Sequence, residues 1–373
     1  MPSPWREVTD RVKLSLPGPA LLPAANGTDT GSRIVLALVP TRVIPRNSAG
    51  SFATRRDGGI VFCYTQYYGG DEDHSAARIA AIKSDDGGRS WSEPRVIIGG
   101  AGGQGLNVMS VSLLRLASGR LALFYLFTRN AEDCGPYLCY SEDDGATWTT
   151  PRLLIDSPGC YVLNNDRAIQ TQAHRLILPM NLHRKAGTRG MAAWYYSDDE
   201  GATWRESDSR WGVGEGLSGL QESGVVQTDS EELFSWARTD LGSQYGFRST
   251  DWGMTWSAPQ ASPLISPLSA ASIKRLPDSR ELFAVYHNHS GHFPFVCEMR
   301  MPLVAAISRD EGVTCPWRKL IEADTCRSYH YVAMHFTPSA LLLTYNAGNA
   351  RMAKFTSPLR LRRIDFSWLR RPA

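Results

Sequence analysis

Short apolar runs alternate with clusters of turn residues along the chain, and no useful length of it has the period of a helix. Gly59 to Tyr64 is one such run, and Arg78 to Lys83 is its neighbour. Similar pairs of runs recur at Ser110 to Phe127, Arg167 to Leu182, Gly224 to Arg238, Ser272 to Tyr286 and Val332 to Tyr345. Runs of this length bounded by Gly, Asp and Ser are typical of antiparallel strands joined by hairpins. The pattern predicts an all-β protein.

A turn signature of Ser, Asp, Gly, Thr or Ser, and then Trp follows these runs five times. The copies begin at Ser84, Ser141, Ser197, Ser249 and Ser308, and in the last one the tryptophan is displaced to Trp317. Asp and Ser side chains bond nearby backbone N–H groups, Gly adopts a conformation closed to other residues, and Trp covers the turn. Five near-identical copies cannot all be one active site, so the signature predicts structural turns.

The repeat length predicts a β-propeller. Subtracting successive serine numbers gives spacings of 57, 56, 52 and 59 residues, enough for several strands per repeat. The length of 373 residues then allows six blades. We expect residues 33–373 to form a six-bladed β-propeller whose last blade combines Tyr331 to Arg363 with Arg33 to Pro40. Residues 1–32 are expected to form an arm on the surface.

The amino-acid composition limits which binding partners and which cellular location we expect. The formal charge of +3 is small and the basic residues are scattered, which excludes nucleic acid and anionic membranes as expected partners. Seven cysteines without CxxC spacing argue against a metal site, and several lie in strand-like runs as small apolar residues. The first 18 residues lack an uninterrupted apolar core. The sequence as written predicts a cytoplasmic protein, with secretion the alternative if the chain starts further upstream.

Repeated S-x-D-x-G-x-[TS]-W turns on an all-β chain resemble the "Asp boxes" of the sialidase (neuraminidase) superfamily, whose members are six-bladed propellers. The resemblance implies an exo-glycosidase that releases a terminal sialic acid without a cofactor. It also implies three arginines that hold the sugar carboxylate, a tyrosine nucleophile activated by a glutamate, and an aspartate acid/base.

The clearest match is the hairpin from Gln221 to Arg238. In the superfamily, a glutamate heads this hairpin and a clamp arginine ends it, so the resemblance gives these roles to Glu222 and Arg238. The same comparison gives a clamp role to Arg300, which precedes the signature at Ser308. Tyr331 then matches the nucleophile and fits better than Tyr329.

The first clamp arginine and the acid/base are matched less closely. Arg46 lies at about the expected distance before the turn at Asp57, and Arg42 is the alternative. The acidic loop from Gly70 to His74 lies where the acid/base is expected, with Asp73 favoured and Asp71 in reserve. Three acidic residues beside a histidine are also compatible with a calcium site or a solvated loop.

The segment Asn165, Asp166 and Arg167 heads a blade hairpin and has no counterpart that we can name. We predict that these three residues contact the substrate, with Asp166 a second alternative for the acid/base. Strand-end caps are the structural alternative.

Three functions remain open at this stage. The leading hypothesis is a glycoside hydrolase that removes a terminal acidic sugar, most simply sialic acid. The second keeps the pocket but acts on a uronic-acid glycan by hydrolysis or elimination, and the third is a non-catalytic glycan-binding propeller. Each takes a glycan as partner, and the sequence leaves the oligomeric state undecided.

Overall fold

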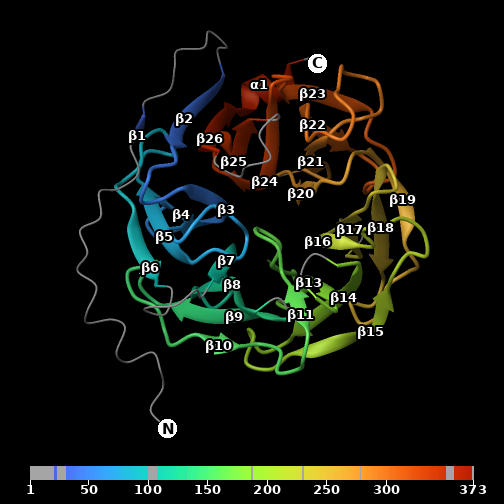
Figure 1. Cartoon of the computed structure of the whole chain (residues 1–373), viewed down its shortest axis with the longest axis horizontal. Coiled ribbons are helices and arrows are strands. Elements are labelled where there is room, and N and C mark those ends of the chain that lie inside the picture. The colour runs from blue at the N-terminus through green and yellow to red at the C-terminus, as the bar shows by residue number, and fades with distance from the viewer. Residues whose placement is uncertain are drawn as a thin grey trace.

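The computed structural model describes residues 21–22, 31–99, 107–130, 132–185, 188–228, 231–277, 279–349 and 357–371. These residues form an all-β propeller whose sheets are arranged around a ring (Figure 1). Of the predicted arm, residues 1–20 and 23–30 lie outside the described residues. The short strand β1 (Leu21–Leu22) pairs with β2 (Ser32–Leu38).

Hydrogen bonding divides the strands of the described residues into five sheets. The first contains β3 (Arg46–Thr54), β4 (Ile60–Tyr67), β5 (Ala77–Ser84) and β6 (Arg95–Ile98). The second contains β7 (Asn107–Arg115), β8 (Leu121–Asn130), β9 (Asp133–Ser141), β10 (Arg152–Leu153), β11 (Cys160–Val162), β12 (Ile169–Gln170), β13 (Leu176–His183), β14 (Gly190–Ser197) and β15 (Arg205–Trp211).

The third sheet contains β16 (Gln221–Gln227), β17 (Leu233–Arg238), β18 (Ser243–Ser249) and β19 (Gln260–Ile265). The fourth contains β20 (Ser272–Arg275), β21 (Leu282–His287), β22 (Leu303–Ser308) and β23 (Trp317–Glu322). The fifth contains β1, β2, β24 (Arg327–Phe336), β25 (Ala340–Asn349) and β26 (Leu359–Asp365), after which the helix α1 (Phe366–Arg370) follows.

The predicted propeller is confirmed, but the predicted count of six separate blades is not. Four sheets have the four or five strands of a single blade, and the remaining sheet has nine strands. The reason is β11, which pairs with β9 on one side and with β13 on the other and so joins two strand groups. The predicted closure is confirmed, because β2 from the N-terminal part pairs antiparallel with the C-terminal strand β26.

The middle strands are apolar on both faces because each sheet packs between two others. In β4, Val61 and Cys63 pack in the cluster that includes β7, β8 and β9, whereas Phe62 and Tyr64 pack in the cluster that includes Leu342 of β25. Successive side chains of a strand point to opposite faces. A continuous apolar run is therefore what a strand between two neighbouring sheets requires.

The five turn signatures form the predicted side-chain contacts. In each, the aspartate accepts a hydrogen bond from the serine hydroxyl, and the serine hydroxyl accepts one from the glycine N–H. All five glycines have positive φ, between 81° and 90°, which disfavours residues with a Cβ. The signatures therefore serve the fold rather than a ligand.

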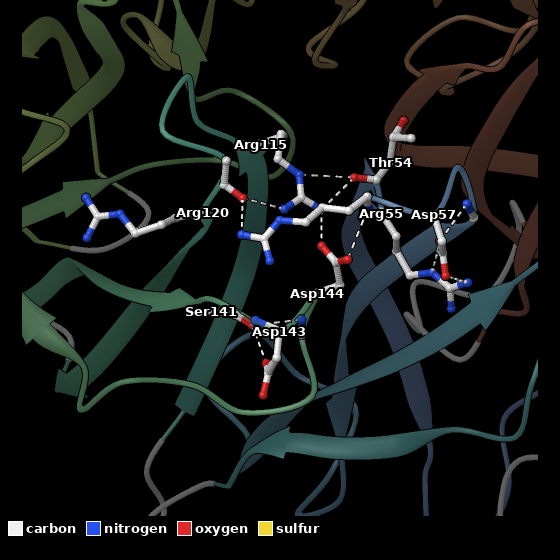
Figure 2. A network of polar contacts seen from close by, with 12 residues as sticks. Thr54, Arg55, Asp57, Arg115, Arg120, Ser141, Asp143 and Asp144 are labelled. Atoms are coloured by element: carbon white, nitrogen blue, oxygen red, sulfur yellow. Dashed lines mark hydrogen bonds and ion pairs between the residues drawn. The ribbon is translucent and has the colours of Figure 1, made fainter.

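Figure 2 shows how one signature is tied to the ends of neighbouring strands. Arg115, at the end of β7, donates to the carbonyl oxygen of Thr54 at 2.8 Å and pairs with Asp144. Asp144 follows Asp143, the signature aspartate, which bonds Ser141. This turn of one sheet therefore anchors the end of the first sheet's inner strand.

Cys134 and Cys160 form a disulfide across β9 and β11, with Cα atoms 4.4 Å apart. The sequence did not predict this disulfide, because pairing of strands that are distant in the sequence brings the two cysteines together. Cys63, Cys139 and Cys315 are free and buried, as expected. No helix among the described residues is long and apolar enough to cross a membrane.

Replacing Cys134 with serine is expected to lower the free energy of unfolding by about 3 kcal/mol, because the disulfide closes a loop spanning 26 residues. Denaturant unfolding with and without a reductant measures this, and the reductant should destabilise only the wild type. Cys326→Ser, at an exposed free cysteine, is the matched control. Equal stability of Cys134→Ser and the oxidised wild type would contradict the prediction.

Candidate active site

Arg46 begins β3 and holds the acidic loop between β4 and β5. Its side chain is 2% exposed, and Nη1 pairs with a carboxylate oxygen of Asp73 at 2.7 Å and donates to the carbonyl of Asp71 at 3.1 Å. The guanidinium also lies over the ring of Tyr67, 4.5 Å from its centre. Asn107 holds the same loop through two hydrogen bonds to its carbonyls, both 2.7 Å. Arg42, the alternative, is exposed at a turn.

The hairpin of β16 and β17 places Glu222 and Arg238 together, as the sequence predicted. Arg238 Nη1 lies 2.9 Å from a Glu222 carboxylate oxygen, and both side chains are largely buried. The guanidinium and the carboxylate attract each other electrostatically, but their geometry is not that of a hydrogen bond. Arg238 also donates through Nε and Nη2 to the Gln221 amide oxygen, at 3.2 and 2.8 Å. A guanidinium held in this way at two edges has a fixed orientation.

A β-bulge recurs in four strands that each lie at one edge of their sheet. The pairing register shifts there in β3, β7, β16 and β24. The residues at the bulges have left-handed φ values: Ala49 at 47°, Ser110 at 58°, Glu222 at 48° and Tyr331 at 54°. Such a conformation costs a non-glycine residue roughly 1–3 kcal/mol, and bulges re-aim side chains. Glu222 and Tyr331 thus occupy equivalent positions on two different sheets.

The surroundings of Tyr331 bring the other predicted residues to one place. The negative charge of Asp73, followed by burial and then by Glu222, raises the pKa of the Tyr331 phenol to about 12, and Arg46 and Arg300 act in the opposite direction. Charges act this strongly only at short range. Tyr329, the alternative nucleophile, is instead fully buried against Tyr345 in the core.

Arg300 completes the cluster from the loop before β22. Its Nη1 donates to Nδ1 of His330 at 3.1 Å, and its carbonyl accepts from the Tyr329 N–H at 2.9 Å. Burial, followed by the positive charge of Arg238, lowers the pKa of Arg300. The structure therefore gathers three guanidiniums, two carboxylates and a phenol, from residues 46 to 331, in one cluster.

A family model described as the BNR repeat-like domain matches residues 58–342. The chain belongs to this BNR repeat-like family, because the model covers more than half of it. Among solved structures, the intramolecular trans-sialidase from Ruminococcus gnavus, in complex with oseltamivir carboxylate, is 14% identical over 88% of this chain and 96% of its own, with a TM-score of 0.71.

Two further structures match this family member over similar lengths. A Dyadobacter fermentans protein of unknown function is 19% identical over 90% of this chain and all of its own, with a TM-score of 0.69. A mutant of Trypanosoma rangeli sialidase that displays trans-sialidase activity is 18% identical over 93% of this chain and 57% of its own, also with a TM-score of 0.69. At these identities the solved structures establish the shared fold.

In this BNR-repeat protein Asp166 lines a pocket together with Lys274, whereas Asn165 and Arg167 are buried. Asp166, with φ of 59°, accepts hydrogen bonds from Ser51, the Met334 N–H and Lys274 at 2.8 to 2.9 Å. Asn165 donates to the Gly50 carbonyl at 3.0 Å, and Arg167 to the Ala271 carbonyl at 2.7 Å. In the described part of the chain, none of the three bonds the six clustered residues. These contacts join the segment to neighbouring strands, and its predicted contacts with a substrate stay a prediction.

Sequence reasoning missed two side chains that orient the arginines. Gln221 holds Arg238, and His330 holds Arg300. The signal available in the sequence was their position, because each directly precedes a residue to which the resemblance gives a role. Two further histidines lie near the clamp arginines, His183 near Arg238 and His287 near Arg300. Across residues 31–99 and the other described segments, no three His, Cys, Asp or Glu side chains could hold a metal.

Because His287 is buried, we expect the free energy of unfolding to fall at acidic pH. Burial, and then Arg300, lowers the pKa of His287 to about 3. In the unfolded chain the His287 imidazole has a pKa near 6.5, so the unfolded state binds a proton before the folded state does. The free energy of unfolding is therefore lost as the pH falls from 6.5 toward 3, by up to about 1.4 kcal/mol per pH unit. Denaturant unfolding at pH 7.5 and 5.0 should show a smaller loss for His287→Asn than for the wild type. Equal losses would contradict this.

Proposed function

We propose that this protein is a glycoside hydrolase that removes a terminal acidic sugar, most simply sialic acid, from a glycan. The observation that carries the proposal is the convergence of Arg46, Arg238 and Arg300 beside a phenol. A sialic acid carries its carboxylate on the anomeric carbon, so cations that bind the carboxylate bring that carbon to a nearby nucleophile.

The proposed reaction has two steps. The Tyr331 oxygen attacks the anomeric carbon while Glu222 accepts the phenolic proton and Asp73 protonates the departing glycosidic oxygen. Asp73 then takes a proton from water, whose oxygen attacks the same carbon, and the phenolate recovers its proton from Glu222. A tyrosine suits this site because a carboxylate nucleophile would be repelled by the carboxylate of the sugar. In the free protein, Asp73 and Glu222 are paired with arginines that the substrate carboxylate would share.

We also propose that the nine-stranded sheet represents two blades, which gives a six-bladed ring. The turn signatures at Ser141 and Ser197 support this, because each follows a different strand, β9 and β14, of that sheet. The cellular location stays a prediction. The Cys134–Cys160 disulfide favours the exported alternative, since disulfides persist mainly in oxidising compartments.

The function is tested by incubating the purified protein with a fluorogenic sialoside, with and without an unsaturated sialic-acid analogue. We expect turnover that the analogue inhibits. Binding of the analogue without turnover would favour a glycan-binding propeller. A protein that neither binds the analogue nor cleaves the sialoside, but acts on a uronic-acid glycoside, would replace sialic acid by that second acidic sugar.

A further inference from the structure

The three arginines of the cluster differ in how their charge is balanced. Arg46 pairs with Asp73, and Arg238 pairs with Glu222. Within the part of the chain that the structure describes, Arg300 has no carboxylate partner, and its one side-chain hydrogen bond is to Nδ1 of His330 at 3.1 Å. A guanidinium that is partly removed from water usually has an anionic partner. Among the three arginines, Arg300 is therefore the one whose positive charge no carboxylate of the described residues pairs with.

The imidazole of His330 can orient this guanidinium in only one protonation state. To accept from Arg300, Nδ1 must carry no proton, so the ring is neutral and its proton lies on Nε2. A carboxylate at the same place would orient Arg300 equally well but would neutralise it. The contact thus combines a fixed orientation with an undiminished positive charge.

We propose that His330 is a positioning residue that aims Arg300 at the carboxylate of the ligand and, by being neutral, leaves the charge of Arg300 to that ligand. This inference rests on the proposed function and deepens it. It makes Arg300 the cation that attracts the ligand most strongly, because binding to Arg46 or Arg238 competes with an internal carboxylate.

The charges around His330 favour its neutral form. Burial, followed by the neighbouring groups Arg300, His287, Arg46 and Arg238, lowers the pKa of His330 well below its usual value, and the three arginines act through their positive charges. Four neighbouring cationic or titratable groups thus act in the same direction. These surroundings therefore favour the neutral imidazole, which can accept the hydrogen bond from Arg300.

Three substitutions separate orientation from charge. His330→Asn keeps a neutral acceptor, because the Asn amide oxygen can take the place of Nδ1. His330→Leu removes the acceptor, and His330→Asp supplies an acceptor that carries a negative charge. His335→Leu is the control, because it removes a partly buried imidazole from the other end of the same strand, where His335 contacts Thr54.

The experiment measures binding of the unsaturated sialic-acid analogue by calorimetry, and kcat and KM for the fluorogenic sialoside. His330→Leu should weaken analogue binding about tenfold or more, the range for a hydrogen bond to a charged group. His330→Asn should restore binding to within about threefold of wild type. His330→Asp should bind no better than His330→Leu, and in all three the increase in KM should exceed the decrease in kcat.

The aspartate variant decides the outcome. If His330→Asp binds the analogue as well as His330→Asn, orientation alone matters and the inference on charge is wrong. If all three variants bind like the wild type and the control, His330 does not position Arg300. A wild type that cleaves sialosides keeps the proposed function in either case, whereas a wild type without binding or turnover overturns both. If His330→Leu fails to fold, the asparagine and aspartate variants carry the comparison.

Discussion

Replacing Tyr331 with phenylalanine is expected to abolish sialoside turnover while analogue binding stays within a few-fold of wild type. The substitution removes one oxygen, the proposed nucleophile, and keeps the ring. Loss of a nucleophile typically lowers kcat by roughly a thousandfold or more. Among the described residues no hydrogen bond involves the Tyr331 hydroxyl, so we expect the thermal unfolding midpoint to be unchanged.

Tyr329→Phe is the matched control for this variant. Tyr329 is on the same strand and is fully buried, but it packs in the core against Tyr345. Its removal should leave kcat within about twofold of wild type, because it touches none of the reacting atoms. Retention of more than a tenth of wild-type kcat by Tyr331→Phe, in protein free of wild-type contamination, would exclude a tyrosyl intermediate.

Replacing Arg300 with methionine is expected to weaken binding of the analogue by about a hundredfold or more, the usual cost of removing one member of a close charge pair. Unlike most substitutions of a largely buried residue, this one should not lower the free energy of unfolding. Arg300 has no carboxylate partner in the described part of the chain, and burial lowers its pKa. Methionine relieves that buried charge at the cost of one hydrogen bond to His330, so we expect an equal or higher free energy of unfolding.

Arg238→Met is the contrasting variant. It leaves the largely buried Glu222 carboxylate without its cation, which typically costs about 3–5 kcal/mol. Calorimetric titration and denaturant unfolding on both variants measure the difference. If Arg300→Met is destabilised as much as Arg238→Met, Arg300 has a structural role and its charge is not reserved for a ligand.

Much of the site could be predicted from the sequence because its parts are attached to recognisable hairpins. Glu222 and Arg238 occupy the two ends of one hairpin at the predicted register, and Arg300 precedes a strand that a turn signature ends. The resemblance also placed Arg46, Asp73 and Tyr331, which the structure brings into one cluster with them. Their catalytic roles stay proposals.

Other features could not be predicted because they depend on pairing between distant segments. The bulges that give Glu222 and Tyr331 left-handed backbones require the partner strand to set the register. The joining of two strand groups by β11, and the disulfide that accompanies it, arise from a third strand inserted between β9 and β13. The hydrogen bonds of Asp166 to Ser51, Lys274 and the Met334 N–H likewise join it to strands that are distant in the sequence, and its contact with a substrate stays a prediction.

By itself the sequence determined the all-β class, the repeated turns, the closure of the ring by β2 and β26, and the local partners of each hairpin. These follow from the strand period of two and from turn residues that act within a few positions. Only the tertiary structure decided which charges meet. Asp73, Glu222 and Arg46 all act on Tyr331 because packing of separate sheets around the ring sets the distances between residues that are more than a hundred positions apart, whereas the ion pairs Arg46–Asp73 and Glu222–Arg238 each form within one sheet.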